Sequence, residues 1–172
     1  MFITNYFRAF FIGEEMIKIN VVAVGKIKED YFSKAIAEYQ KRLSRFCEFN
    51  IIEVPEENYA KFEEGLVAKI KKKEAENIAP NLKGYLFATA IEGKKYDSVA
   101  FAKKLKNISD SGQGVITFVI GGSYGLDDSV KTRADSLISF SDMTFPHTFF
   151  RVMLTEQLYR AFCINSGVSY HK

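Results

Sequence analysis

The hydrophobic pattern of the chain switches repeatedly between a strand period and a helix period. Short apolar runs predict five buried strands, at 17–24, 51–54, 84–91, 115–120 and 137–140. Between them, apolar residues recur at steps of three and four, which is typical of one helical face and predicts helices over 32–46, 59–70 and 99–108. The alternation predicts an α/β fold class: a mostly parallel sheet flanked by helices, in one domain.

Capping residues refine the helix boundaries. Asp127 or Asp128 can begin a short helix, because a carboxylate there accepts unpaired amide protons. The helix that carries Tyr59 is expected to stop near Pro80, and Pro146 is expected to start the last helix with Thr148 as its cap. The third strand is expected to end at Gly93.

Residues 1–15 differ from the rest of the chain. They are rich in Phe and Ile, but Arg8 interrupts the apolar run, which is too short for a membrane span and lacks the basic start of a secretory signal. Met16 directly precedes the first strand pattern. We therefore expect either an extension or an upstream mis-start at 1–15, an ordered segment being the alternative, and a single domain at 16–172.

Composition narrows the possible functions. With 47% hydrophobic and 26% charged residues, the chain is expected to be a globular protein. A net charge of +3 permits contact with nucleic acid without requiring it. Cys47 and Cys163 lie far apart among apolar neighbours, which favours buried free thiols and a cytoplasmic location. His147 and His171 are the only histidines, so no metal site is expected.

Two strand-to-turn junctions hold the candidate chemistry. The fourth strand runs into the glycine turn at 121–125, and the fifth into the segment 139–147. The carboxyl ends of parallel strands are where such sheets bind ligands, although a tight connection without any ligand is the alternative. Neither a GxxxxGK[ST] nor a GxGxxG pattern is present. The apolar turn therefore favours a flat, neutral ligand such as adenosine over a pyrophosphate.

The last predicted helix is apolar around almost its whole circumference. Such a helix must be buried on all sides, which a terminal helix can achieve against a partner subunit. Glu156 and Arg160 have the spacing of an ion pair within one helix. Arg151 lies near the helix start, where a cation opposes the helix dipole. This position favours an anion or substrate contact, with an ordinary salt bridge as the alternative.

Several motifs together resemble one known family, the ribosomal RNA large subunit methyltransferase H family of SPOUT-class pseudouridine N3-methyltransferases. The resemblance covers Met16 to the end of the chain. It is carried by the segments 119–126 (VIGGSYGL), 139–147 (SFSDMTFPH), 156–161 (EQLYRA) and 170–172 (YHK), with 23–28 (AVGKIK) and 39–43 (YQKRL) in the amino-terminal half.

The resemblance implies more than the spacing does. It implies a SPOUT-type fold with a C-terminal trefoil knot, a homodimer, and S-adenosyl-L-methionine as the methyl donor. It also implies methylation of N3 of a pseudouridine in 23S rRNA within the assembled ribosome, with no membrane and no metal as partner. Cofactor contacts carried over from the family fall on Thr89, Gly121, Phe140, Ser141, Asp142, Met143, Thr144 and Phe145.

The chain departs from the family pattern at two of these positions, Thr89 and Asp142, and at Tyr124 in the glycine turn. Relatives usually carry Leu at Thr89, many have Lys or Gln at Asp142, and many have Asn at Tyr124. We expect the changes at Asp142 and Tyr124 to be tolerated if backbone groups form most of the pocket.

Methylation of a ring nitrogen requires its proton to leave, so a general base or an anion-stabilising group is expected. His147 can accept a proton near neutral pH, and Tyr170, His171 and Arg151 are further candidates. We expect Arg151 and residues 170–172, which we call the tail, to hold the RNA and the target base. Tyr170 is expected to stack on the target base. The alternatives are a helix-start role for His147 and a frayed terminus for the tail.

Two other functions are compatible with the residues. The glycine turn could belong to a different nucleotide-binding α/β enzyme, or the chain could be a non-catalytic ribosome-binding module.

Overall fold

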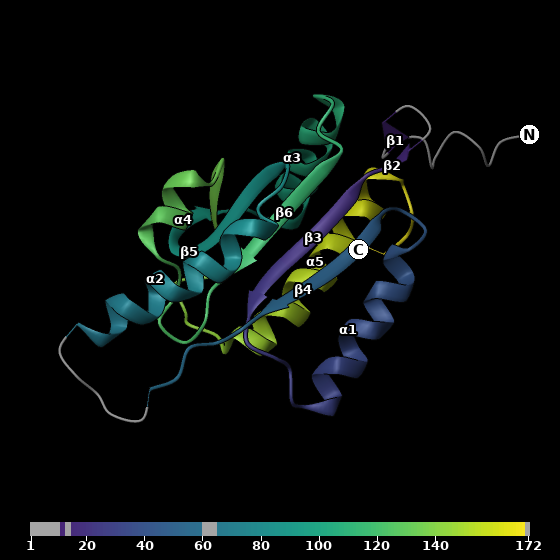
Figure 1. Ribbon diagram of the computed structural model, residues 1–172. Coiled ribbons are helices and arrows are strands. Elements are labelled where there is room, and N and C mark those ends of the chain that lie inside the picture. Colours follow the sequence, from purple (N-terminus) through teal and green to yellow (C-terminus); the bar gives the residue numbers. More distant parts are fainter. Residues whose placement is uncertain (1–10, 13–14, 60–64, 171–172) are drawn as a thin grey trace, which may run out of the picture.

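The computed structural model describes residues 11–12, 15–59 and 65–170 of the chain (Figure 1). Its centre is a five-stranded sheet in the order β4-β3-β6-β5-β7, in which every neighbouring pair is parallel. The strands are β3 (Lys18–Val24), β4 (Glu48–Val54), β5 (Tyr85–Lys95), β6 (Val115–Ile120) and β7 (Ser136–Ser139). This sheet confirms the predicted α/β class.

Helices cover both faces of the sheet (Figure 1). One face packs against α1 (Asp30–Leu43), α3 (Ser98–Asp110) and α5 (His147–Asn165), and the other against α2 (Leu66–Ile78) and α4 (Asp128–Arg133). A short 3-10 turn, Ala79–Asn81, follows α2, and β1 (Phe11–Ile12) pairs with β2 (Glu15–Met16) in an antiparallel ribbon.

The central strands are apolar because both of their sides are buried. Along β3, Ile19 and Val21 pack in the core under α1, α3 and α5, whereas Val22 and Val24 pack in the core under α2 and α4. Side chains of a strand alternate between its two faces, so a strand covered by helices on both needs an almost continuous apolar run. The same reason explains the apolar run in β6.

Several predicted boundaries are wrong. Instead of ending at Gly93, β5 runs on to Lys95, because the strand bulges and then pairs again: Thr89 and Lys94 both lie opposite Ile138. A side chain at Gly93 would place its Cβ 2.5 Å from the Ile138 carbonyl carbon, so the bulge depends on glycine.

Two helix starts also differ from the prediction. Leu66 begins α2, so Tyr59 lies outside this helix, and the segment 60–64 lies outside the described residues. The last helix starts at His147 with Pro146 at the cap position and no side-chain cap, so Thr148 does not cap it. The predicted cap on α4 is confirmed, since the Asp127 carboxylate accepts the amide of Ser129 at 2.9 Å.

Other sequence expectations concern single features. Both Cys47 and Cys163 are buried free thiols, as predicted, and burial raises the pKa of each. Within the described ranges no helix is long and apolar enough to cross a bilayer, and no group of three potential metal-ligating side chains occurs there. Of the proposed extension, the described part is the ribbon of β1 and β2, and its status as an extension stays a prediction.

Candidate functional site

A cavity of about 820 Å³ opens at the carboxyl ends of β5, β6 and β7. We call it the strand-end cavity. Parallel strands bring these ends together, and the glycine turn and the segment 138–147 close over them. Its lining includes the β5 residues 89–92, the glycine-turn residues 120–126, Lys71, Lys131, and residues 138–141, 143–147 and 150. The sequence-predicted composite pocket is therefore present.

The glycine turn is shaped by close backbone contacts. Gly125 has φ of +76° and donates its amide to the Gly122 carbonyl at 3.0 Å. A Cβ at Gly121 would lie 2.7 Å from the Gly125 carbonyl carbon, so only glycine fits there. Ser123 and Tyr124 form the exposed tip, and both line the cavity.

The second turn has its own hydrogen bonds. The Ser139 hydroxyl donates to the Ser141 carbonyl at 2.9 Å, and the Met143 amide donates to the Ser141 hydroxyl at 3.0 Å. These bonds fix the turn so that Phe140 and Phe145 line the cavity. Among the predicted cofactor contacts in this turn, Phe140, Ser141, Met143, Thr144 and Phe145 all belong to the lining.

Asp142 is the one predicted cofactor residue outside the lining. Its side chain is 83% exposed and forms an ion pair with Lys95 at the end of β5. An exposed pair of this kind contributes little to stability. The departure from the family pattern at Asp142 therefore falls on the outer surface of the turn.

Thr89, one of the expected departures from the family pattern, lines the cavity. Its hydroxyl donates to the Val119 carbonyl at 3.0 Å, so this polar group is used within the sheet. A satisfied hydroxyl does not bring an unpaired donor into an apolar wall, which makes the wall less dependent on Leu at this position.

His147 is half-buried, lines the cavity and begins α5. Burial lowers its pKa, and the nearby Arg151 guanidinium lowers it further, while Glu56 and Glu29 oppose the shift. A neutral imidazole is therefore favoured at neutral pH, which is the state that can accept a proton.

Arg151 is fully buried and does not line the cavity. Its guanidinium donates to Glu53 Oε1 at 3.0 Å, to the Val24 carbonyl at 2.5 Å and to the Gly25 carbonyl at 3.0 Å. It thereby fastens α5 to the ends of β3 and β4. Of the two interpretations offered by the sequence, these contacts support the salt bridge.

Tyr170 lies against α5 rather than in the strand-end cavity. Its hydroxyl donates to Glu156 Oε1 at 3.1 Å, and its ring packs on Tyr159 and under the Arg160 guanidinium. Glu156 and Arg160 also form the predicted ion pair, at 2.6 Å. His171, the fourth catalytic candidate, lies outside the described residues.

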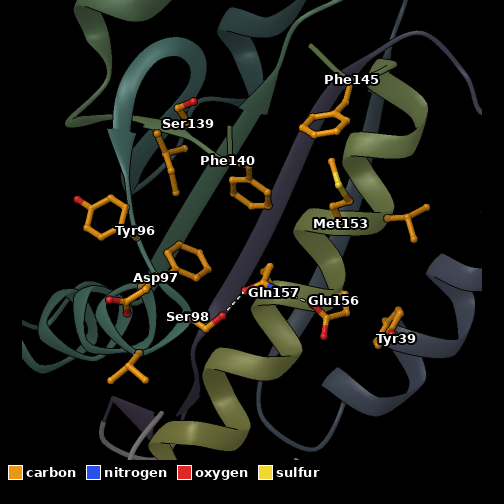
Figure 2. Close-up of a pocket in the computed structure, with 14 residues that line it drawn as sticks. Tyr39, Tyr96, Asp97, Ser98, Ser139, Phe140, Phe145, Met153, Glu156 and Gln157 are labelled. Atoms are coloured by element: carbon orange, nitrogen blue, oxygen red, sulfur yellow. Dashed lines mark hydrogen bonds between the residues drawn. The ribbon is translucent and has the colours of Figure 1, made fainter. Parts of the chain in front are cut away.

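A second cavity, of about 850 Å³, lies beside α5 (Figure 2). Side chains from α1, α3, α5 and the segment 138–145 line it, and Figure 2 shows Phe140, Phe145 and Met153 on its walls with Glu156 farther along α5. Val99 at its rim is 54% exposed. Ile138, Ser139, Phe140 and Phe145 line both cavities.

Charged residues around the strand-end cavity were not predicted from the sequence. Lys71 and Lys131 line it, and Lys131 pairs with Glu92 at 2.7 Å. Glu74 is 3% exposed beneath the glycine turn and accepts the Glu57 amide at 3.3 Å. Because Lys71, Glu74 and Lys131 sit in charged helical stretches of ordinary composition, periodicity gives no signal that distinguishes them from solvated positions.

Comparisons with known proteins agree with one another. A family model described as predicted SPOUT methyltransferase matches residues 17–171. The ribosomal RNA large subunit methyltransferase H of Lactobacillus acidophilus is 51% identical over 159 residues, which cover 91% of this chain and 100% of the relative. The protein of the same name from Bifidobacterium adolescentis is 47% identical over the same length. Among solved structures, a probable methyltransferase from Bordetella pertussis has a TM-score of 0.54 at 14% identity, covering 91% of this chain and 98% of its own, which is a likeness of fold alone.

Proposed function

The chain belongs to the SPOUT methyltransferase family, and we propose that it uses S-adenosylmethionine to methylate large-subunit ribosomal RNA at N3 of a pseudouridine. Family membership confirms the resemblance found in the sequence. The relatives' name supports ribosomal RNA as the substrate. The strand-end cavity, which gathers the glycine turn and the segment 138–147 in one place, is the observation that carries the proposal.

The residues of this cavity fit the proposed cofactor. A volume of about 820 Å³ is within the usual range for small-molecule sites, and the walls combine apolar side chains with the backbone of two turns. Such walls suit an adenosine moiety, and Lys71, Lys131 and Glu92 offer charges for its amino-acid end. We propose that Thr89, Gly121, Phe140, Ser141, Met143, Thr144 and Phe145 hold the cofactor, with Asp142 outside.

The chemistry divides between the cofactor and the chain. When bound, S-adenosylmethionine supplies an electrophilic methyl group, which the ring nitrogen takes while the sulfur keeps the electrons of the broken bond. The chain must orient the base and accept its N3 proton. Half-buried His147 is the residue of this cavity whose neutral state is favoured, so we assign it the role of acceptor.

We propose that the tail acts from a second copy of the chain. The second cavity is lined by apolar side chains that are partly open to solvent, which suits a homodimer contact along α5. Tyr170 binds Glu156, a residue of that cavity, and the two cavities share four lining residues. We propose that a tail that starts there reaches the strand-end cavity of a partner seated on α5, where Tyr170 and His171 hold RNA.

The remaining parts of the proposal follow from the family. We propose that the crossing of the segment 138–147 beside the glycine turn forms a trefoil knot, and that the enzyme meets its substrate on the assembled ribosome in the cytoplasm. Light scattering tests the dimer, since a mass near 19.6 kDa would rule it out.

Transfer of tritiated methyl groups to ribosomes that lack the modification tests the function directly. We expect label at one pseudouridine of 23S rRNA, with assembled ribosomes a better substrate than naked RNA. Calorimetry tests one rival function, and the same labelling assay, combined with ribosome binding, tests the other. Binding of ATP or NAD but not of S-adenosylmethionine would favour another nucleotide-binding enzyme, and ribosome binding without any label would favour a non-catalytic module.

The tail is tested by a chain that ends at Val168. We expect this variant to fold and to bind S-adenosylmethionine as the full chain does, because the strand-end cavity keeps its lining. Methylation of ribosomes should fall by about a hundredfold, the lower range of an acid–base or positioning group. Unchanged methylation would remove Tyr170 and His171 from the mechanism.

A further inference from the structure

A glutamate outside the predicted site faces His147 across Gly25. A Cβ at Gly25 would lie 3.3 Å from Glu56 Oε2 and 3.4 Å from His147 Nε2. The distance between Glu56 Oε2 and His147 Nε2 can therefore be no greater than the sum of these two distances, which is about the length of two hydrogen bonds. No direct hydrogen bond or ion pair between them occurs in the described part of the chain, so the carboxylate and the imidazole face each other across a short gap.

Gly25 keeps this space open. It directly follows β3 with φ of +82°, a conformation that disfavours any residue with a side chain, and its amide donates to the Val54 carbonyl at 2.8 Å. Glu56 follows β4 by two residues, so the paired ends of β3 and β4 set its position relative to Gly25. A larger residue at Gly25 would fill the gap between carboxylate and imidazole.

The other oxygen of Glu56 is held by the glycine turn. Glu56 Oε1 accepts a hydrogen bond from the Ser123 hydroxyl at 3.2 Å, and Ser123 lines the strand-end cavity. One carboxylate thus lies between the turn at the end of β6, which holds it, and the imidazole at the start of α5. A base whose ring is oriented by a third group needs such a carboxylate beside it.

We propose that Glu56 is a positioning residue for His147: held by Ser123, its carboxylate keeps the Nε2 proton of the imidazole directed toward Oε2. That tautomer leaves Nδ1 with a free lone pair as the proton acceptor. The inference rests on the proposed function, in which His147 accepts the proton of the target base.

The proton balance is simple. The N–H bond of the target ring breaks and its electron pair stays on the nitrogen, while the proton binds Nδ1 of His147. The imidazolium that forms keeps its Nε2 proton toward the Glu56 carboxylate, whose negative charge stabilises it. After product release, Nδ1 returns the proton to solvent.

Charged groups from three segments act on this imidazole, and a fourth segment carries a carboxylate near Glu56. Glu56 after β4 and Glu29 at the start of α1 favour its protonated form, whereas Arg151 on α5, which Glu53 partly neutralises, opposes it. Glu74 on α2 lies close enough to Glu56 to repel it. Removing the charge of Glu56 should therefore lower the pKa of His147, and removing a nearby carboxylate that does not face the ring should not.

Glu56→Gln and Glu56→Ala test the inference, with Glu57→Gln as the matched control at the next position. The readout is the imidazole nitrogen spectrum of His147, assigned by its loss in His147→Asn and followed through a pH titration without cofactor. We expect a lower His147 pKa in Glu56→Gln, a mixture of tautomers in Glu56→Ala, and neither change in Glu57→Gln. An unchanged titration and tautomer in both Glu56 variants would overturn the proposal.

Kinetics supply the second arm. In Glu56→Ala we expect kcat to fall roughly tenfold, less than the 10²–10⁴-fold contribution of a general base itself, with the Kd for S-adenosylmethionine within about twofold of the parent. A loss in Kd alone would assign Glu56 to cofactor binding and overturn the positioning role. If the wild-type chain does not methylate ribosomes, the proposed function fails, while the coupling of Glu56 to His147 still shows in the spectra.

Discussion

Replacing Arg151 separates a structural role from a catalytic one. Arg151→Met keeps much of the side-chain length and removes the guanidinium, which is fully buried and makes three hydrogen bonds. The carbonyls of Val24 and Gly25 are then left without this donor, at about 1–3 kcal/mol for each buried group. Breaking a fully buried ion pair by removing one partner costs about 3–5 kcal/mol, and the lower end applies here because the Glu53 side chain is 32% exposed. The two estimates overlap at a loss of about 3–4 kcal/mol.

Urea denaturation followed by circular dichroism measures this loss. With a slope of about 2 kcal/mol per molar urea, the midpoint should fall by about 2 M. The melting temperature should fall by roughly 10 °C for a chain of this size. All variants must be compared at one protein concentration, because a dimer makes apparent stability depend on concentration.

Two further variants calibrate the result. Lys106→Met removes an exposed pair with Asp110 one helical turn away and should change the free energy of unfolding by less than about 0.5 kcal/mol. Glu53→Gln keeps an acceptor for Arg151 and should cost less than Arg151→Met does. If Arg151→Met were as stable as the parent but unable to methylate ribosomes, Arg151 would be a substrate contact and the structural interpretation would be refuted.

Three other changes have definite outcomes. Gly121→Ala should weaken S-adenosylmethionine binding at least tenfold by calorimetry, because its Cβ would lie 2.7 Å from a backbone atom of the glycine turn. Asp142→Ala should leave that affinity within about twofold, since the side chain is exposed and outside the cavity. Burial raises the pKa of Glu74, so the folded state holds this proton more tightly than the unfolded state, and stability falls as pH rises from the unfolded pKa through the raised folded one. Thermal melts of Glu74→Gln should lack that decline as pH rises above the ordinary pKa of a glutamate.

The fold could be predicted where the hydrophobic period of either a strand or a helix dominated a segment. The apolar run of β6 and the capping Asp127 mark their elements without help from distant residues. Prediction failed where tertiary contacts decide: β5 passes Gly93 because Ile138 pairs with the strand on both sides of its bulge, and that pairing is invisible along the sequence. Tyr59 continues a helical spacing, yet the chain there is not helical.

The site was predictable only in part for a related reason. The glycine turn and the segment after β7 can be found in the sequence from glycine and from apolar residues at strand ends, and both line one cavity. Glu56 and Glu74 carry no such signal, because an acidic residue in a polar stretch is usually solvated. Their importance depends on what the paired ends of β3 and β4 and the glycine turn bring next to them. Arg151 has an unfavourable position in the helix dipole that the sequence does reveal, and three acceptors in its buried site explain how the chain tolerates it.

The division of the candidate residues between two cavities has a structural cause. Ile138, Ser139, Phe140 and Phe145 line both, so the end of β7 and the segment that joins it to α5 form a single wall between the two cavities. In a close-packed protein such a wall cannot shift on one side without changing the space on the other. Whatever covers the second cavity therefore also sets the position of Phe140 in the first. His147 stands where this wall joins α5, and Arg151 holds that junction to the ends of β3 and β4. The buried arginine thus belongs to the site through the wall it fixes, and its contacts require no direct approach to the substrate.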